Sequence, residues 1–295
     1  MLKLSSVLPA EVYLMIKNII GGIAVGIANV IPGVSGGTMM VLLGIFDKTM
    51  EAIPGVLAPK NPKRKEHIIF LFQVLVGVAV GLIGFAKVLE YLFNICPTQT
   101  MYWFIGLIAF SIPIFVNQEM KGHKFNVVAF IIGLAIVIGL ELLSPKGGVD
   151  VNPAFPSISL PFLLTMILIG FVGGFSMFLP GVSGSMVLLI LGYYYLFKSY
   201  LANVLTFSLD ILIPLAFMGI GIILGIVVSA KVLNVALEKN KPATLSFLLG
   251  LIIASTMVLF INTLNVTFTF ELIITSALSF LLGGVIIYLL NKVMV

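Results

Sequence analysis

The sequence IPGVSGGT at residues 31–38 interrupts a long apolar stretch, and a second copy, LPGVSGSM, lies at residues 179–186. Proline removes a backbone donor and clashes with the preceding helical turn, while glycine weakens a helix interior. Hydrocarbon holds no water to satisfy the freed backbone groups, so such a break survives only against protein or a wet cavity. Paired breaks at corresponding places in two halves of a chain are typical of the binding site of a transporter.

The composition places the chain in a bilayer. Of its 295 residues, 60% are hydrophobic and 9% are charged, against about 25% charged residues in globular proteins. The mean hydropathy is +1.23. The single cysteine, Cys96, rules out an intrachain disulfide and a cysteine-rich metal site, and we expect no metal and no cofactor. The basic residues behind the net charge of +5 cluster in loops, so no nucleic-acid partner is expected.

Six apolar runs are each long enough to cross a bilayer. The predicted spans cover residues 68–90, 100–116, 126–143, 209–232, 244–262 and 270–291. Two further stretches, 14–46 and 160–197, are too long for one crossing and contain the breaks. Their arms of about 13–18 residues reach ~20–27 Å, short of a hydrocarbon core about 30 Å thick. We therefore predict that each stretch is a re-entrant hairpin with its tip near the middle of the membrane.

The basic residues predict the orientation. The densest basic cluster, at residues 60–65, follows the first hairpin. If the chain crosses the membrane at each predicted span, the basic residues that lie on the same face as this cluster are Lys121, Lys124, Lys239, Lys241 and Lys292. The loops at 91–99 and 263–269 hold no Lys or Arg, and only Lys146 and Lys198 fall on their side. By the positive-inside rule, both termini are predicted to be cytoplasmic.

The two halves of the chain are related beyond the breaks. Gly44 recurs as Gly192, and Ala86-Lys87-Val88-Leu89 recurs as Ala230-Lys231-Val232-Leu233. Collinear matches favour a duplication, and an odd number of crossings per copy inverts the second copy. The predicted fold class is an all-α integral membrane protein with two inverted repeats, each a re-entrant helical hairpin plus three transmembrane helices. The first repeat covers 1–125, the third span and an outer linker cover 126–159, and the second, inverted repeat covers 160–295.

The breaks are also the candidate anion site. Each is followed by a short helix predicted to begin near Ser35 or Ser183, and the free N–H groups and positive dipole of such a helix end attract anions. Glycine lets the backbone approach a ligand closely, and serine and threonine offer hydroxyl groups. Inverted hairpins would bring the two tips together. The residues predicted to bind a phosphate or carboxylate are Pro32, Gly33, Val34, Ser35, Gly36, Gly37 and Thr38, with Gly181, Val182, Ser183, Gly184 and Ser185.

Less specific interpretations exist for the same residues. A Pro-Gly kink whose serines bond back to helix carbonyls explains either break taken alone. Lys87 and Lys231 lie near span ends, where lysine usually snorkels to the interface, and their alternative role is capture of an anionic headgroup. The pairs Gly77/Gly81 and Gly221/Gly225 have the small-xxx-small spacing of closely packed membrane helices.

Catalysis and conduction are disfavoured. The Gly-Val-Ser-Gly sequence is similar to a serine-nucleophile motif, but a nucleophile needs a base within hydrogen-bond reach. The only histidines, His67 and His123, are predicted to lie in cytoplasmic loops, so no catalytic residue is expected and an intramembrane hydrolase is a weak alternative. A glycine-rich channel filter is disfavoured because the hairpins carry no ring-forming carboxylates.

Asn29-Val30-Ile31 leading into residues 32–38, together with Gly44 and the second copy, resembles the polyprenyl-phosphate transporter family over most of the chain. The resemblance implies a bacterial plasma-membrane protein that moves undecaprenyl phosphate from the outer to the inner leaflet, where the carrier is reused for envelope polymers. In the second copy Ser185 and Met186 replace Gly37 and Thr38, so the two half-sites need not be equivalent.

The residues themselves indicate an anion site, and only the resemblance implies the lipid. A secondary transporter of a small soluble anion is therefore the alternative function. A coupling ion, proton or sodium, and the oligomeric state are both left open by the sequence.

Overall fold

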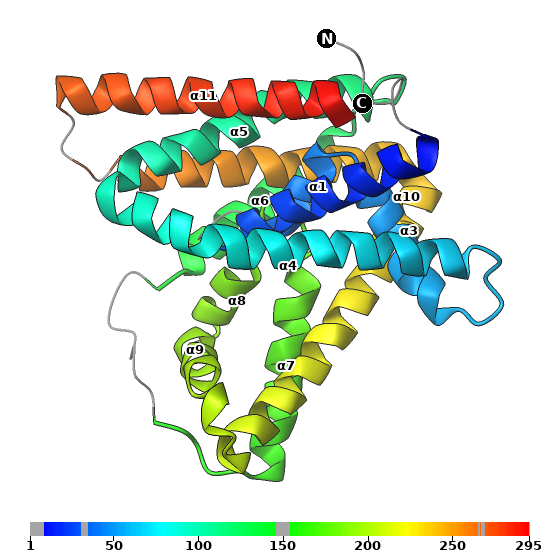
Figure 1. Ribbon diagram of the computed structural model, residues 1–295, viewed down its shortest axis with the longest axis vertical. Helices are drawn as coiled ribbons and strands as arrows, with labels where there is room; N and C mark the ends of the chain where they lie inside the picture. Colours follow the sequence, from blue (N-terminus) through cyan, green and yellow to red (C-terminus); the bar gives the residue numbers. More distant parts are fainter. Residues whose placement is uncertain (1–8, 31–34, 146–153, 265, 267–268, 295) are drawn as a thin grey trace.

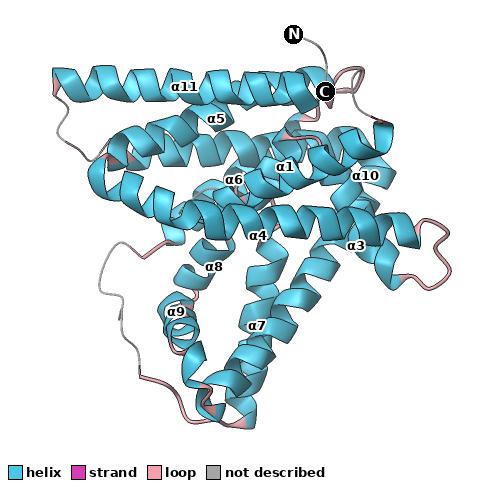
Figure 2. Ribbon diagram, viewed as in Figure 1, coloured by secondary structure: helices cyan, strands magenta, loops and turns pink. Residues whose placement is uncertain are grey.

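The computed structural model describes residues 9–30, 35–145, 154–264, 266 and 269–294, and every regular element in these ranges is helical (Figures 1 and 2). The elements are α1 (Ala10–Val30), α2 (Gly36–Leu42), α3 (Phe46–Leu57), α4 (Arg64–Ile95), α5 (Pro97–Gln118), α6 (Val127–Leu143), α7 (Leu160–Ser176), α8 (Gly184–Ile190), α9 (Tyr194–Ala202), the 3-10 turn η2 (Val204–Thr206), α10 (Leu209–Asn262) and α11 (Phe270–Met294). Within the described residues, α1, α5, α10 and α11 are long and apolar enough to cross a membrane, and α6 and α7 are shorter apolar helices. The chain is thus an all-helical, multi-pass membrane protein over the residues described.

Local sequence signals explain where several helices start and bend. The Asn126 side chain accepts a hydrogen bond from the Ala129 N–H at 2.9 Å and so caps α6. Inside α10, Asn240 has non-helical angles (φ −152°, ψ 71°), and Pro242 follows with no N–H to donate. The 54 residues of α10 are therefore two helices joined at a kink, in agreement with the separate spans predicted at 209–232 and 244–262.

The helices that follow the two breaks are short. Helices α2 and α8 have only seven residues each. They end at Gly44 (φ +64°) and Gly192 (φ +78°), where the backbone turns left-handed before α3 and α9 begin. Glycine adopts this conformation without a Cβ clash, so these two positions end the returning helix and redirect the chain. The predicted re-entrant arm over 34–46 therefore contains the short helix α2 and a glycine turn, and its re-entrant path stays a prediction.

The glycines at small-xxx-small spacing bring helix backbones into contact. A Cβ on Gly77 of α4 would lie 2.2 Å from the Ile19 carbonyl oxygen of α1. In the second half, a Cβ on Gly221 of α10 would lie 2.1 Å from the Ile167 carbonyl oxygen of α7. The glycines one turn further along each helix make corresponding contacts. The pairs α1–α4 and α7–α10 therefore pack through the same glycine surface, as small residues allow in membrane helices.

The remaining long helices pair across the two halves. A Cβ on Gly106 of α5 would lie 2.0 Å from the Phe280 carbonyl oxygen of α11. Correspondingly, a Cβ on Gly250 in the second part of α10 would lie 2.2 Å from the Phe130 carbonyl oxygen of α6. Helices from the first half are therefore packed directly on helices from the second half.

The two glycine-packed helix pairs, α1–α4 and α7–α10, are oriented differently in the fold. Helices α1, α4, α5 and α11 run side by side across Figure 1, whereas α7 and the first part of α10 project away from them, drawn in green and yellow. Helices α8 and α9 accompany this projecting pair. The halves share their packing contacts but not their orientation, and their inverted relation stays a prediction.

One histidine lies elsewhere than the sequence predicted. His67 is not in a loop but in the first turn of α4, where its side chain is only 3% exposed. Its Nδ1 lies 3.2 Å from the Asn61 Nδ2, and its Nε2 lies 3.6 Å from a carboxylate oxygen of Glu51. His123 does lie outside the helices, in the turn after α5.

Candidate functional site

In the first break, the serine side chain caps the helix that follows. Ser35 is the N-cap of α2, and its Oγ accepts a hydrogen bond from the Gly37 N–H at 3.2 Å. The side chain of Ser35 is only 4% exposed. Pro32, Gly33 and Val34, which were predicted to bind the anion, lie outside the described residues. The short helix predicted to begin near Ser35 is confirmed.

In the second break, the corresponding serine is less buried. Gly181 takes a left-handed conformation (φ +81°), and Ser183 is the N-cap of α8 without a side-chain capping bond. Instead, the Ser183 and Ser185 hydroxyl oxygens lie 2.7 Å apart and share a hydrogen bond at an exposed position. The helix predicted to begin near Ser183 is likewise confirmed.

The two breaks touch each other. The Ser35 Oγ donates to the Leu179 carbonyl oxygen at 3.1 Å, and the Gly181 N–H donates to the Thr38 Oγ1 at 2.8 Å. Gly37 lies so close to the second break that a Cβ there would be 2.8 Å from the Phe178 carbonyl oxygen. The predicted meeting of the two tips is therefore confirmed. It is made by the hydroxyls of the first break and the backbone of the second.

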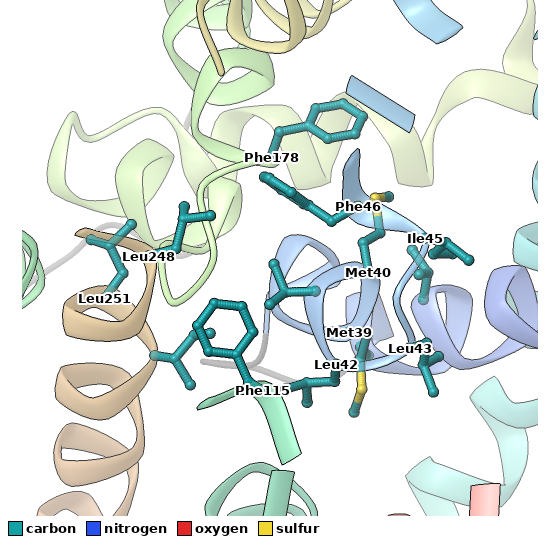
Figure 3. Close-up of a cluster of buried hydrophobic side chains, with 14 of the residues drawn as sticks. Met39, Met40, Leu42, Leu43, Ile45, Phe46, Phe115, Phe178, Leu248 and Leu251 are labelled. Carbon is teal, nitrogen blue, oxygen red and sulfur yellow. The ribbon is translucent and has the colours of Figure 1, made fainter. Parts of the chain in front are cut away.

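A buried apolar cluster holds this contact in place. Figure 3 shows side chains from α2 and the turn after it gathered with Phe115 of α5, Phe178 of the second break, and Leu248 and Leu251 of α10. Leu248 and Leu251 have no exposed surface. Since a packed core resists displacement, the position of each break is fixed by helices of both halves.

A cavity of about 300 Å³ opens beside the contact. The residues lining it are Asn29, Ser35, Gly36, Gly173, Met177, Val182, Ser183, Gly184, Ser185, Leu188, Tyr194, Phe197 and Ile222. We call it the break cavity. Its polar groups come from the ends of the helices at the breaks, and its apolar walls come from α8, α9 and α10. None of these described lining residues is a Lys, Arg, His, Asp or Glu, so an anion here would meet neutral donors.

The structure divides the predicted site residues into two groups. Those that line the break cavity are Ser35, Gly36, Val182, Ser183, Gly184 and Ser185. Gly37, Thr38 and Gly181 instead join one break to the other. Lys231 is exposed on α10 and does not line the cavity, and nothing is described of the Lys87 side chain on α4.

Sequence reasoning missed one polar residue of the cavity. Asn29, the second-last residue of α1, lines the break cavity although it precedes the Pro-Gly sequence. The available signal was an amide side chain at the end of an apolar helix, one turn before the break.

A second polar region lies where α3, α4 and α10 meet. It borders a cavity of about 490 Å³ lined by Asp47, Lys48, Glu51, Lys63, Glu66, His67, Asn234, Leu237, Glu238 and Lys241. Lys241, next to the kink of α10, lies 3.3 Å from Asp47 and 3.8 Å from Glu119. Burial and the Asp47 carboxylate raise the pKa of Glu119, and Lys241 opposes that shift. The Lys48 ammonium hydrogen-bonds the Glu66 carboxyl and lowers its pKa. In the described residues, no three His, Cys, Asp or Glu side chains are grouped so as to hold a metal ion.

A family model described as undecaprenyl phosphate translocase-like (VCA0040-like) matches residues 25–273, which include both breaks. The chain belongs to this family. The resemblance in the break sequences is thus confirmed at the level of the undecaprenyl phosphate translocase-like family.

Two relatives carry the name polyprenyl-phosphate transporter. The protein from Vibrio cholerae is 28% identical over 192 residues, which is 64% of this chain and 57% of the relative. The protein from Staphylococcus aureus is 25% identical over 194 residues, which is 65% of this chain and 68% of the relative. The matched part therefore spans little more than half the length of the Vibrio relative. No solved structure matches the chain.

Proposed function

We propose that this protein moves polyprenyl phosphate across the membrane, with undecaprenyl phosphate carried from the outer to the inner leaflet of a bacterial plasma membrane. The carrier would then be reused in cell-envelope synthesis. The observation that carries the proposal is the break cavity, which has polar groups at the contact of the breaks and apolar walls beside them. Such a cavity suits a ligand with a polar head on an apolar chain. The names of the two relatives support the same substrate.

The phosphate would bind among the cavity-lining residues of both breaks, with Pro32, Gly33 and Val34 completing the first break. Gly37, Thr38 and Gly181 would hold the two half-sites together through the contact between the breaks. Lys231 on α10 and its equivalent Lys87 on α4 would attract the anionic headgroup as it arrives. A cavity of about 300 Å³ holds a phosphate and the first part of the chain, so the remaining isoprenoid would lie between helices or in lipid.

Two inverted repeats would give this site access from both faces. Each repeat would consist of a re-entrant hairpin and three crossings, over 1–125 with the third span in 126–159, and over 160–295. The matching glycine contacts of α1–α4 and α7–α10 support a duplication. The Lys and Arg distribution supports cytoplasmic termini. Rocking of one repeat against the other would then expose the cavity to each leaflet in turn.

The site favours binding over hydrolysis. The Ser35 hydroxyl is already bonded to a carbonyl oxygen, and Tyr194 is the only titratable side chain among the described lining residues. His67 is bonded at the start of α4, in a different cavity. A serine nucleophile would lack the base that it needs. We therefore propose a transporter and not an enzyme.

The test is a leaflet-resolved transport assay in liposomes that contain the purified protein and labelled undecaprenyl phosphate. We expect label to leave the accessible leaflet faster than in protein-free liposomes. Proton and sodium gradients are imposed separately to identify a coupling ion. Inorganic phosphate is added as a competitor, and uptake of phosphate without movement of the lipid would instead favour a transporter of a small soluble anion.

A further inference from the structure

Asn29 presents a free amide to the break cavity. Its side chain is exposed, and no hydrogen bond joins it to the described residues. A Cβ on Gly36 would lie 2.8 Å from the Asn29 Nδ2 and 2.9 Å from its Oδ1, so the amide lies directly against the first residue of α2. An exposed amide in a largely apolar cavity has both a donor and an acceptor available for a ligand.

The second break has an apolar residue in the same place. Met177 precedes Gly184 by the same number of residues as Asn29 precedes Gly36, and it also lines the break cavity. A Cβ on Gly184 would lie 3.0 Å from the Met177 Cγ. One half of the chain therefore places an amide at this position and the other half places a thioether. The cavity is therefore lined by an amide at this position of the first break and by a thioether at the equivalent position of the second.

The serine hydroxyls of the cavity already have partners. The Ser35 Oγ bonds the Leu179 carbonyl oxygen and the Gly37 N–H. Ser183 and Ser185 bond each other. Asn29 is thus the polar side chain next to a break that an incoming headgroup meets without breaking a bond to the described residues, whereas the Tyr194 hydroxyl belongs to α9.

We propose that the Asn29 amide is the specificity-determining contact for the phosphate of a phosphate monoester on an apolar chain, while Met177 faces the chain. This inference rests on the proposed function. The Nδ2 donates to a phosphate oxygen. A neutral amide also leaves no unpaired charge in the cavity when the lipid departs, whereas a lysine would.

The same arrangement selects against a diphosphate. A second phosphate adds negative charge, and no cationic side chain among the described lining residues compensates for its desolvation. The monophosphate should therefore bind more tightly than the diphosphate of the same chain.

The experiment measures equilibrium binding of radiolabelled farnesyl phosphate to the full-length protein in detergent, with farnesyl diphosphate and farnesol as competitors. For the wild type, we expect farnesyl phosphate to bind more tightly than either competitor. Asn29→Leu should weaken binding of farnesyl phosphate roughly ten- to hundred-fold, because a hydrogen bond to a charged group is lost. Asn203→Leu makes the same chemical change at the exposed end of α9 and should leave the affinity unchanged.

Two further variants separate recognition from folding. Asn29→Asp keeps the shape but replaces the donor with a negative charge, and it should also bind farnesyl phosphate weakly. The double variant with Asn29→Met and Met177→Asn moves the amide to the equivalent position, and it should bind more tightly than Asn29→Met alone. If the Asn29→Leu and Asn29→Asp proteins bound farnesyl phosphate as the wild type does, the inference would be overturned and the proposed function would stand. If the wild type bound farnesol as tightly as farnesyl phosphate, both the inference and the proposed function would be contradicted.

Discussion

The two halves of the chain make the same backbone contacts but present different polar groups. Gly77 and Gly221 pack against equivalent isoleucine carbonyls, and each short helix ends at a left-handed glycine. Both break serines line the cavity, but Ser35 is buried and bonded to the opposite half, while the Ser183 hydroxyl bonds Ser185 of its own break. The shared contacts depend on the absence of a side chain, so they persist only where glycine persists. The polar side chains carry no such constraint, so Ser35 joins the two breaks while Ser183 remains accessible from the cavity.

The two halves also differ in the charged residues that follow each predicted hairpin. Asp47, Glu119 and Lys241 form an ionic cluster where the first hairpin meets α5 and the kink of α10. The equivalent positions of the other half are Tyr195, Thr263 and Pro97, which carry no charged side chain at neutral pH. This ionic cluster therefore has no charged equivalent at the corresponding positions of the other half.

The largest expected effect distinguishes Gly181, which packs closely against backbone, from Gly44, which forms a turn in open space. Gly181 has φ +81°, and a Cβ there would lie 2.4 Å from the Leu251 carbonyl oxygen, whereas Gly44 has φ +64° with open space around it. Gly44→Ala should cost roughly 1–2 kcal/mol for the left-handed backbone alone. Gly181→Ala adds a collision with backbone and should lower the melting temperature of the detergent-solubilised protein considerably more. Equal shifts for the two variants would show that the second break does not need its close contact with α10.

An intermediate effect distinguishes the two serines. Ser35→Ala removes a helix cap and a bond between the breaks, and it should destabilise the protein by about 1–3 kcal/mol. Ser183→Ala should leave the melting temperature nearly unchanged but slow lipid transport in liposomes. Thermal melting and the leaflet-resolved assay together measure both variants. The reverse pattern, with an unstable Ser183→Ala protein and a stable Ser35→Ala protein, would contradict the structural role of Ser35 and the accessible position of Ser183.

The smallest expected effect concerns the ionic cluster. Lys241 and Asp47 are 38% and 49% exposed, and pairs of that kind contribute about 0–1 kcal/mol. Lys241→Ala should therefore reduce stability slightly, and less so at high salt. Thr263→Ala, at the uncharged equivalent of Glu119, is the control, and the change in stability that it causes should not depend on salt.

The pH dependence of the same cluster follows from Glu119. Because the pKa of Glu119 is raised in the folded protein, the folded state holds this proton more strongly than the unfolded state. Its contribution is therefore most favourable at low pH and decreases as the pH rises through the folded-state pKa. Glu119→Gln should remove that decrease from a series of melting curves taken from acid to neutral pH. A profile identical to that of the wild type would show that Glu119 is not buried as described.

Much of the fold could be predicted from local patterns. The apolar runs predicted the long helices, and proline with glycine predicted both breaks, because these signals act within a few residues of the chain. The short helices after the breaks were also predicted, but Gly44 and Gly192 were interpreted as markers of the repeat and their left-handed turns were not predicted. His67 was placed in a loop because its burial depends on Asn61 and Glu51, which no local pattern connects to it.

The sequence by itself determined that this is an all-helical membrane chain with two matching breaks, and it pointed to the family. Those features follow from hydropathy, backbone chemistry and residue identity, which are properties of short segments. Only the tertiary structure decided that the Ser35 and Thr38 hydroxyls join one break to the other, and that Asn29 and Met177 face one cavity. These relations join residues far apart in the chain. They arise from how helices of both halves pack, and that packing is set by the sum of many contacts across the fold.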